Sequence, residues 1–409
     1  MIFTITFALL FLPQVHADQP PDPLPFSENL FAAHTTYFEI RDGEIVGADA
    51  LLAALTQAHF VALGELHNRK HLGELTTSLL RFLAPHGFAH FAVETGPYAA
   101  QKLQALIGEG RSDVLDFYAG YASRVFDLIP IPFFKGETDL DFLEAAHAFH
   151  FTLWGLDQEF YFSYKFLIDE LLRLGGEEVS PGQQRMHRTL SRRLYWLDRR
   201  NQVADLFGGN FQRSCRLQDD DTFQAFLDSF AGFGHPDIQL IREALHKTLE
   251  IYCLNERGGD SDPVRVTYFK ENFDRNFKAA LAENPQPKVF LKMGSWHMGR
   301  HESPRGLQDI GHHVAQLAES RNQESVHIRY HNRFLEGGDV LERSGWEGLE
   351  RLLSVGVRDQ WALIDIRPIR ALFEDGQLTG TASASELRTI RNWDFVIIAP
   401  EDHGVSPHW

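Results

Sequence analysis

The feature that most constrains this chain is a local pattern that occurs four times: a short apolar segment followed closely by a carboxylate or an imidazole. Its first example is the apolar segment 60–63, which continues through Gly64 into Glu65 and His67. A short apolar segment without polar alternation is typical of a parallel strand covered on both faces. In open α/β sheets, ligands and catalytic groups usually lie at the carboxyl ends of such strands. The pattern therefore predicts an α/β fold with its functional groups along one edge of the sheet.

The other three copies, each with the polar residue that follows it, are 89–93 with Glu94, 151–156 with Asp157, and 288–293 with His297. If these strands are parallel and adjacent, their polar side chains converge with Glu65 and His67 on one edge of one sheet. One acidic residue after a strand means little, but four strand ends of this kind are difficult to explain by packing alone.

Helical patterns connect these strands and predict the rest of the fold. An apolar stripe over 72–83 indicates a helix, so residues 60–94 form one βαβ unit with a right-handed crossover. We expect further strands at 326–330, 361–366 and 394–398, and a loop-rich cover over 108–136. Residues 160–260 have little strand signal and predict a helical insertion that forms a wall or lid over a pocket. The fold class is α/β, a mostly parallel sheet flanked by helices.

Glu65 and His67 are two residues apart, so on an extended segment their side chains point to the same side. A neighbouring carboxylate raises the basicity of a histidine and fixes its tautomer. The pair is therefore suited to removing a proton from water, a step worth roughly 10²–10⁴-fold in rate. The alternative is a capping glutamate and a surface histidine. His71 joins this cluster if the following helix has already begun.

The other strand ends offer groups with several roles. Glu94 is suited to holding a metal, orienting His67 or binding a substrate ammonium, with a helix cap as the alternative. His297 is a candidate catalytic group, with a histidine that only packs in a turn as the alternative, and Arg300, three residues on, is suited to stabilising an oxyanion. Asp157 is expected to contact the substrate or to make buried hydrogen bonds. Because these groups lie on the edge of the sheet, we expect their removal to leave the fold intact.

Several chemistries are excluded by spacing. The chain has no Gly-x-Ser-x-Gly elbow, no Walker A or dinucleotide glycine motif, and no His-Glu-x-x-His. A divalent metal stays open, because Glu65, His67, Glu94 and His297 offer mixed nitrogen and oxygen ligands. The net charge of −17 argues against nucleic acid and anionic membranes as partners. The expected partner is a small-molecule or peptide substrate, and the oligomeric state is open.

The N-terminal segment has the features of a signal peptide. Residues 2–12 are apolar, and 15–17 resemble a cleavage site, although no Lys or Arg precedes the apolar run. The run is too short to span a membrane. We therefore expect a signal peptide at 1–17 and one α/β domain at 18–409, exported to the periplasm or secreted.

Only two cysteines, Cys215 and Cys253, are present. In an oxidising compartment they can form one disulfide, and two buried or free thiols are the alternative. Neither follows a predicted strand, so we expect neither to be needed for activity.

At these residues the sequence resembles the superfamily of the erythromycin esterases, ChaN and Tiki. The resemblance covers roughly 58–100 and 265–302, with motifs at 63–67, 91–95 and 296–300 and a further similarity at 153–157. It implies an α/β core with helical insertions. In the esterase branch, the Glu and His of the first motif and the Glu of the second are implicated in activating water. The resemblance therefore implies these roles for Glu65, His67 and Glu94.

The chain departs from the esterase pattern in three places. The first motif has Glu and His two residues apart, as in the ChaN-like branch, whereas the esterases have them three apart. The late motif of the esterases has two histidines three apart, and here His297 matches the second while Gly294 stands at the first. An arginine expected before a helix has Lys270 as its nearest candidate, which would contact the substrate.

These observations predict an exported hydrolase in which Glu65, His67, Glu94 and His297 activate water to cleave an ester or amide-like bond. One alternative is a ChaN-like protein that binds haem or iron, for which Tyr98, Tyr118 and Tyr121 are unspecific ligand candidates. Another is a Tiki-like metal-dependent protease. The cofactor is accordingly none, a divalent metal or haem.

Overall fold

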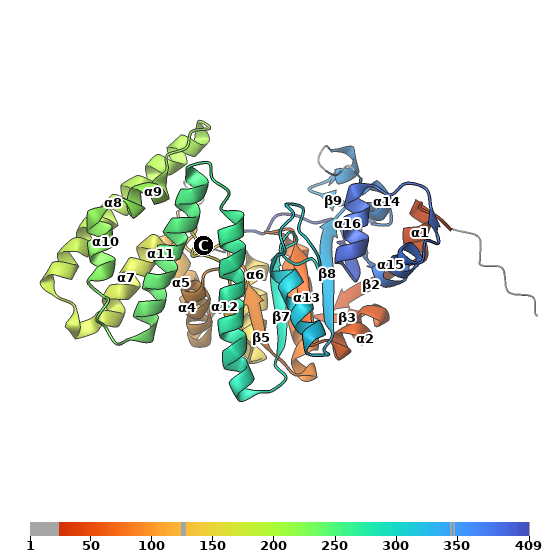
Figure 1. Ribbon diagram of the computed structural model, residues 1–409, viewed down its shortest axis with the longest axis horizontal. Helices are drawn as coiled ribbons and strands as arrows, with labels where there is room; N and C mark the ends of the chain where they lie inside the picture. Colours follow the sequence, from red (N-terminus) through yellow and green to blue (C-terminus); the bar gives the residue numbers. More distant parts are fainter. Residues whose placement is uncertain (1–23, 124–127, 344–345, 347, 409) are drawn as a thin grey trace, which may run out of the picture.

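The computed structural model describes residues 24–123, 128–343, 346 and 348–408, and the expected signal peptide at 1–17 lies outside them. In this part of the chain, nine strands form one sheet in the order β3-β2-β11-β13-β8-β4-β7-β5-β6. From β13 to β6 every neighbouring pair is parallel, whereas β11 pairs antiparallel with β13 and β2, and β2 with β3. The predicted α/β class with a mostly parallel sheet is confirmed (Figure 1).

The strands of this sheet are β2 Thr35–Arg41, β3 Glu44–Val46, β4 Phe60–Glu65, β5 Phe88–Val93, β6 Thr152–Gly155, β7 Lys288–Gly294, β8 Ser325–Asn332, β11 Trp361–Asp365 and β13 Phe395–Ala399. Two short pairs lie outside it: β1 Leu24–Pro25 with β12 Leu378–Thr379, and β9 Phe334–Leu335 with β10 Gly338–Asp339. All four strands that carry the repeated pattern are therefore present, and they are neighbours in the order β4-β7-β5-β6.

One face of the sheet is covered by α2 Asp49–Gln57, α3 Lys70–Leu83, α4 Pro97–Glu109 and α6 Glu137–Ala148. The stripe predicted on α3 is buried in this layer, since Leu72, Leu75 and Leu79 are almost inaccessible. The other face is covered by α12 Asp262–Glu283 and α13 Ile310–Ser320, and near β11 and β13 by α1 Glu28–Ala33, α14 Glu350–Leu353, α15 Ile366–Glu374 and α16 Ala384–Asn392. Short 3-10 helices lie at Ala84–His86, Gly176–Glu178 and Val340–Glu342.

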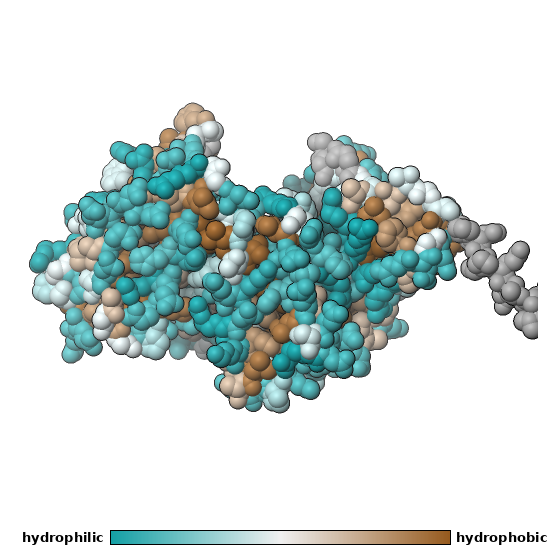
Figure 2. Space-filling view, viewed as in Figure 1, coloured by the Kyte–Doolittle hydropathy of each residue, from teal (hydrophilic) through white to brown (hydrophobic). Residues whose placement is uncertain are grey.

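The helical insertion is confirmed and consists of α7 Tyr164–Gly175, α8 Pro181–Leu206, α9 Arg213–Gln218, α10 Asp221–Asp228 and α11 Pro236–Glu256. It lies at one end of the molecule, while the antiparallel strands lie at the other (Figure 1). Within it, Cys215 of α9 and Cys253 of α11 form a disulfide, which resolves the two alternatives left open by the sequence. Figure 2 shows a mostly hydrophilic face with apolar side chains at the tip of α8, where Leu206 and Phe207 are exposed.

The loop-rich cover expected over 108–136 is partly wrong, because α5 Arg111–Tyr121 occupies its first half. Val114, Phe117 and Tyr118 of this helix are buried at helical spacing. The glycines and prolines that flank this segment obscured the short apolar periodicity in the sequence. In the described part of the chain, no helix is both long and apolar enough to cross a membrane.

Candidate active site

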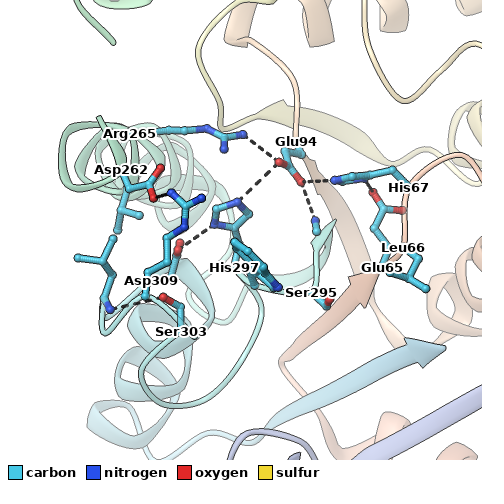
Figure 3. Close-up of a pocket in the computed structure, with 15 residues that line it drawn as sticks. Glu65, Leu66, His67, Glu94, Asp262, Arg265, Ser295, His297, Ser303 and Asp309 are labelled. Carbon is cyan, nitrogen blue, oxygen red and sulfur yellow. Dashed lines mark hydrogen bonds and ion pairs between the residues drawn. The ribbon is translucent and has the colours of Figure 1, made fainter. Parts of the chain in front are cut away.

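The carboxyl ends of β4, β7 and β5 meet at a cavity of about 370 Å³ (Figure 3). Its polar lining comes from the ends of these strands, from the start of α12 and from the segment before α13: Glu65, His67, Glu94, Asp262, Arg265, Ser295, His297, Ser303, Arg305 and Asp309. No lining residue belongs to the insertion. The insertion therefore does not form the wall or lid that we expected from its sequence position.

Glu94 lies at the centre of the charged groups. One carboxylate oxygen accepts a hydrogen bond from the backbone N–H of Gly294 at 2.6 Å, and Arg265 donates to the other at 2.9 Å. The Nε2 atoms of His67 and His297 lie 3.6 and 3.7 Å from these two oxygens. Burial opposes ionisation, but His67, His297 and Arg265 outweigh it and lower the pKa of Glu94 to about 2. Glu94 is therefore an anion between two imidazoles.

Each imidazole has its own carboxylate on the opposite side of the ring. His67 Nδ1 lies 2.9 Å from Glu65 Oε1, and His297 Nδ1 lies 2.8 Å from Asp309 Oδ2. An ionised carboxylate only accepts, so Nδ1 donates in both pairs and Nε2 faces the cavity. The ring of His67 also stacks on Phe133, with centroids 4.0 Å apart. The two rings are thus held in one orientation and one tautomer.

Both histidines are shifted toward the protonated form. Burial lowers the pKa of His67, but the carboxylates of Glu94 and Glu65 outweigh it and raise the pKa above its usual value. The same opposition applies to His297, whose pKa is raised by Asp309 and Glu94 against burial. Each histidine therefore titrates above 6.5, the ordinary pKa of histidine.

Lys292 is a site residue that the sequence reasoning did not identify. It lies on β7, is 5% exposed, and forms an ion pair with Glu65, which is 3% exposed. Buried Asp139 lies nearby, and burial raises its pKa to about 7 despite the charge of Lys292. A lysine inside an otherwise apolar strand was the available signal, because a buried cation requires an anionic partner.

Arg265 is the second functional residue that was missed, and it replaces Lys270. It lies in the first turn of α12 and donates to Glu94 and, at 3.0 Å from Nε, to Asp157. Lys270 lies further along the helix and donates to the carbonyl of Gln308. Asp157 does not line the cavity and holds Arg265 in position.

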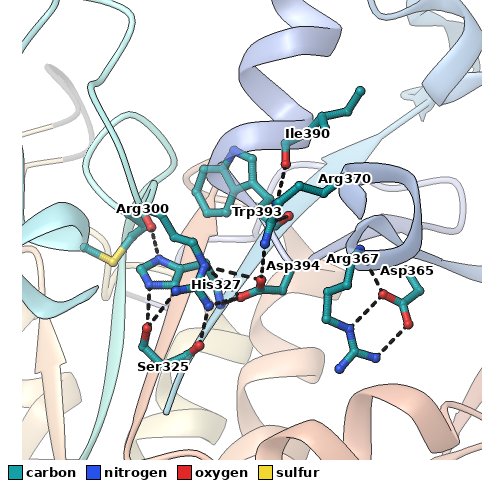
Figure 4. A network of polar contacts seen from close by, with 10 residues as sticks. Arg300, Ser325, His327, Asp365, Arg367, Arg370, Ile390, Trp393 and Asp394 are labelled. Atoms are coloured by element: carbon teal, nitrogen blue, oxygen red, sulfur yellow. Dashed lines mark hydrogen bonds and ion pairs between the residues drawn. The ribbon is translucent and has the colours of Figure 1, made fainter. Parts of the chain in front are cut away.

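Arg300 does not reach the cavity, although it follows His297 closely in sequence. Its guanidinium donates to Asp394 at 3.2 Å and to the Ser325 hydroxyl at 3.0 Å, at the amino end of β8 (Figure 4). After His297 the chain returns toward the opposite end of the sheet, so proximity in sequence was misleading. The predicted oxyanion role of Arg300 is corrected to a structural one.

His71 is also absent from the cavity lining. Its Nδ1 lies 2.7 Å from the carboxylate of Glu74, and its Nε2 lies 3.1 Å from the carbonyl of Glu401. The helix α3 has begun at Lys70, which was our condition for His71 to join the cluster, but that expectation is wrong because the side chain contacts the C-terminal segment instead. His71 links two parts of the fold and does not contact the candidate site.

A glycine faces the centre of the site. A Cβ atom at Gly294 would lie 3.0 Å from His67 Nε2 and 3.2 Å from Glu94 Oε2. This is the position at which the esterase motif has its first histidine. A side chain at this position would press on both groups, so glycine keeps the cavity open between His67 and Glu94.

The residues of this cluster do not fit a divalent metal. Glu65, His67 and Glu94 offer ligand atoms within 4.8 Å of one another. Both oxygens of Glu65 are occupied by His67 and Lys292, and Glu94 is already paired with Arg265. A cation placed here would meet two fixed positive charges. The cluster therefore balances its own charge.

The tyrosines considered for haem also lie elsewhere. Tyr98 donates to Glu170 at 2.7 Å, Tyr121 donates to Asp169 at 2.9 Å, and Tyr118 donates to a backbone carbonyl at 2.9 Å. None of the three lines the cavity at the strand ends. Their hydroxyls serve packing between the helices and do not form an iron site.

Neither a protein-family model nor a curated protein sequence matches the chain. Solved structures do match it. A Bacillus cereus protein is 15% identical, with a TM-score of 0.54 over 94% of this chain and 100% of its own. A succinoglycan biosynthesis protein is 14% identical, with a TM-score of 0.54 over 92% of this chain and 97% of its own.

The third similar structure is the erythromycin esterase EreC, a variant with His replaced by Asn, in its open conformation. It is 14% identical, with a TM-score of 0.51 over 88% of this chain and 94% of its own. Identities this low establish the fold alone. The chain therefore has an erythromycin esterase-like fold, as its motifs predicted.

Proposed function

We propose that the protein is a hydrolase that activates water to cleave an ester or amide-like bond. The observation that carries this proposal is the pair of carboxylate–histidine dyads whose Nε2 atoms face Glu94 in one cavity. Each Nδ1 is held by a carboxylate, whereas each Nε2 lies beyond hydrogen-bond distance of Glu94 and so stays free to bind water or substrate. The esterase-like fold agrees with the proposal. The carboxylates and imidazoles at the strand ends of this chain are suited to activating water for attack on an ester or amide-like bond.

His67 is the general base. Glu65 holds its Nδ1–H, so in the neutral ring the lone pair of Nε2 is directed toward the space beside Gly294. A water molecule there transfers a proton to Nε2 while its oxygen attacks the carbonyl carbon of the substrate. Glu65 keeps the ring in this tautomer and stabilises the imidazolium that forms.

His297 and Arg265 act on the opposite side of Glu94. Protonated His297, held by Asp309, can hydrogen-bond the carbonyl oxygen through Nε2–H during the attack and then transfer that one proton to the leaving group. Arg265 takes the electrophilic role first assigned to Arg300 or Lys270, since its charge lies within the cavity wall. The carboxylate of Glu94 fixes the positions of the two imidazoles and the guanidinium relative to one another.

The test is a panel of esters and amides assayed with wild type and with His67→Ala. The variant should lower kcat by at least about 10²-fold, because it removes proton transfer. Its melting temperature should stay close to that of wild type, since the His67 side chain is about one-third exposed. His313→Ala, on α13 outside the cavity, is the matched control. Turnover that survives in folded His67→Ala would refute the role of this residue, and dialysis against EDTA should leave activity unchanged.

Export is part of the same proposal. The apolar run 2–12 and the site at 15–17 support it, and the disulfide between Cys215 and Cys253 is typical of oxidising compartments. N-terminal sequencing of protein from a periplasmic or culture fraction should give a start after Ala17. An intact N-terminus on cytoplasmic protein would contradict the idea.

A further inference from the structure

A second cavity, of about 320 Å³, adjoins the first at the carboxyl end of β8. The residues common to the two cavities are Leu66, Ser295, Trp296 and Ser303. The rest of its wall comes from β8, from one face of α16, from the segment after β7 and from the segment before α14. A substrate in the first cavity that extends past Trp296 therefore enters the second.

Arg329 of β8 lines this cavity, and its charge has no ion-pair partner among the described residues. Its guanidinium donates to the Thr389 hydroxyl at 2.8 Å, and its buried Nε has no partner. In the described part of the chain, no carboxylate forms an ion pair with it. Burial lowers the pKa of Arg329 to about 10, and Arg388, which lines the same cavity, adds to this effect. A cation in such a setting is costly unless an anion accompanies it.

His331, two residues along β8, is the second unpartnered group. It is 2% exposed, and neither ring nitrogen has a hydrogen-bond partner among the described residues. Burial, with Arg329 beside it, lowers the pKa of His331 well below its usual value, so the ring is neutral. It keeps one N–H donor and one acceptor unused, which is rare for a buried side chain.

Two other arginines that the fold largely encloses have an anionic partner among the described residues. Arg213 pairs with Asp198 inside the insertion, and Arg265 pairs with Asp157 beside the first cavity. The second cavity has one acidic lining residue, Glu302, which is exposed. Arg329 is therefore an exception in this fold, and its missing partner is best supplied from outside.

We propose that the second cavity binds an oxyanion of the substrate, a carboxylate or a phosphate, on Arg329 and Arg388. A guanidinium matches either group through paired N–H donors, and His331 supplies a further donor. This inference rests on the proposed function, because it places the bond to be cleaved in the first cavity. The substrate class is then an ester or amide that carries an anionic group beyond the carbonyl.

Binding can be tested without hydrolysis. Thermal melting of wild type should be followed in acetate, in inorganic phosphate and in chloride at equal ionic strength. The melting temperature should rise with the logarithm of acetate or phosphate concentration, and the anion with the larger rise identifies the preferred group. Phosphate stabilises proteins in general, so Arg329→Gln and the exposed Arg388→Gln provide the reference. An equal rise in wild type and in both variants would overturn the proposal.

The same variants separate a ligand site from a structural one. In chloride, Arg329→Gln should melt no lower than wild type, because it removes an unpaired buried charge. Arg213→Gln is the matched control and should melt lower, because it leaves Asp198 without its cation. His67→Ala should keep the anion-dependent rise, so a failure of the hydrolase proposal is distinguishable from a failure of this one.

Kinetics sharpen the assignment once a substrate is found. Two esters that differ only in a distal carboxylate and its neutral amide should be compared. Wild type should favour the carboxylate, and Arg329→Gln should lower the ratio of the two kcat/KM values about 10-fold to 100-fold, from the strength of charged hydrogen bonds. An unchanged ratio in the variant would contradict the proposal.

Discussion

The two cavities along the carboxyl edge of the sheet differ in how their charges are balanced. In the first, every buried charge has a partner within the chain: Glu65 has Lys292, Glu94 has Arg265, and His297 has Asp309. In the second, Arg329 has no anion in the described part of the chain. A network in which every charge is paired, here called the closed network, holds its reactive groups in place before the substrate binds. An unpaired charge is stabilised only when an anionic ligand binds to it. The difference assigns chemistry to the first cavity and recognition to the second.

The largest expected effect comes from opening the closed network. Glu65→Gln leaves Lys292 as an unpaired buried cation and should lower the free energy of unfolding by about 3–5 kcal/mol. This outcome differs from our expectation that groups on the sheet edge can be removed without loss of fold. The reason is that Glu65 is buried inside the strand end and does not lie on a solvated rim.

The matched control for Glu65→Gln is the double variant Glu65→Gln/Lys292→Met, which removes both charges. It should recover most of the lost stability in urea unfolding while remaining inactive, because His67 has lost the carboxylate that orients it. If the single and double variants unfold alike, the ion pair is not what holds this part of the structure.

A smaller but more specific effect is expected at Gly294. A methyl group there would lie against His67 Nε2 and Glu94, in the space assigned to water. Gly294→Ala should therefore lower kcat by roughly 10-fold to 100-fold. The upper value equals the smallest loss expected when general-base proton transfer is removed altogether. The backbone is not strained, since φ at this residue lies outside the left-handed region, so any loss of stability should be small and come from the slight shift that His67 and Glu94 must make. Gly108→Ala, where a Cβ has ample room, is the control. A folded, fully active Gly294→Ala would place the water elsewhere.

The pH dependence follows from the two raised histidine pKa values. His67 must lose its proton to act as a base, and His297 must keep its proton to act as an acid. A plot of kcat/KM against pH should therefore be bell-shaped, and its two apparent pKa values describe the interacting histidines together. Because both folded-state pKa values exceed 6.5, the ascending limb should lie above pH 6.5. An ascending limb below pH 6 would exclude His67 as the base.

Stability should follow the same groups with a defined sign. A histidine whose folded pKa is raised stabilises the fold fully below pH 6.5 and loses that contribution as pH rises through the folded pKa. Above pH 6.5, the melting temperature of wild type should therefore fall more steeply with pH than that of His67→Ala. Glu94 acts in the opposite direction, since its pKa is lowered to about 2. Its contribution is present above about pH 4.5 and is lost as pH falls toward 2.

Much of the fold was predictable because it depends on local patterns. Apolar strands of four to seven residues and the stripe on α3 are visible in the sequence, whereas the adjacency of β4, β7, β5 and β6 was a condition of the prediction that the sheet order meets. Glu65, His67, Glu94 and His297 come together for the same reason. The identity of their partners depends on contacts between distant segments. Lys292, Arg265 and Asp309 could be assigned only when the sheet order and the helix starts were known.

The errors at Arg300 and His71 have a related physical origin. Both lie within four residues of a site histidine, yet each has passed the point where the chain turns away from the edge. Sequence distance is a poor guide just after a strand end, because one further turn reverses the direction of a side chain. The second cavity could not be predicted from the sequence at all. Arg329 was read only as part of a strand, and its lack of an anion is a property of the folded chain.

The smallest expected effect is at Trp296, where the two cavities meet. Its side chain is 51% exposed, and the guanidinium of Arg305 lies 5.2 Å from the ring centroid. Trp296→Ala should change the free energy of unfolding by no more than about 0.5 kcal/mol, as for other surface positions. It should lower kcat/KM for a distally charged ester by about 10-fold or less, because the tryptophan only guides the substrate between the cavities. Trp196→Ala, on the exposed face of α8 and 60% exposed, is the control and should change neither quantity. A loss at Trp296 as large as that at Arg329 would mean that the two cavities work as one compartment, and the division between chemistry and recognition would not hold.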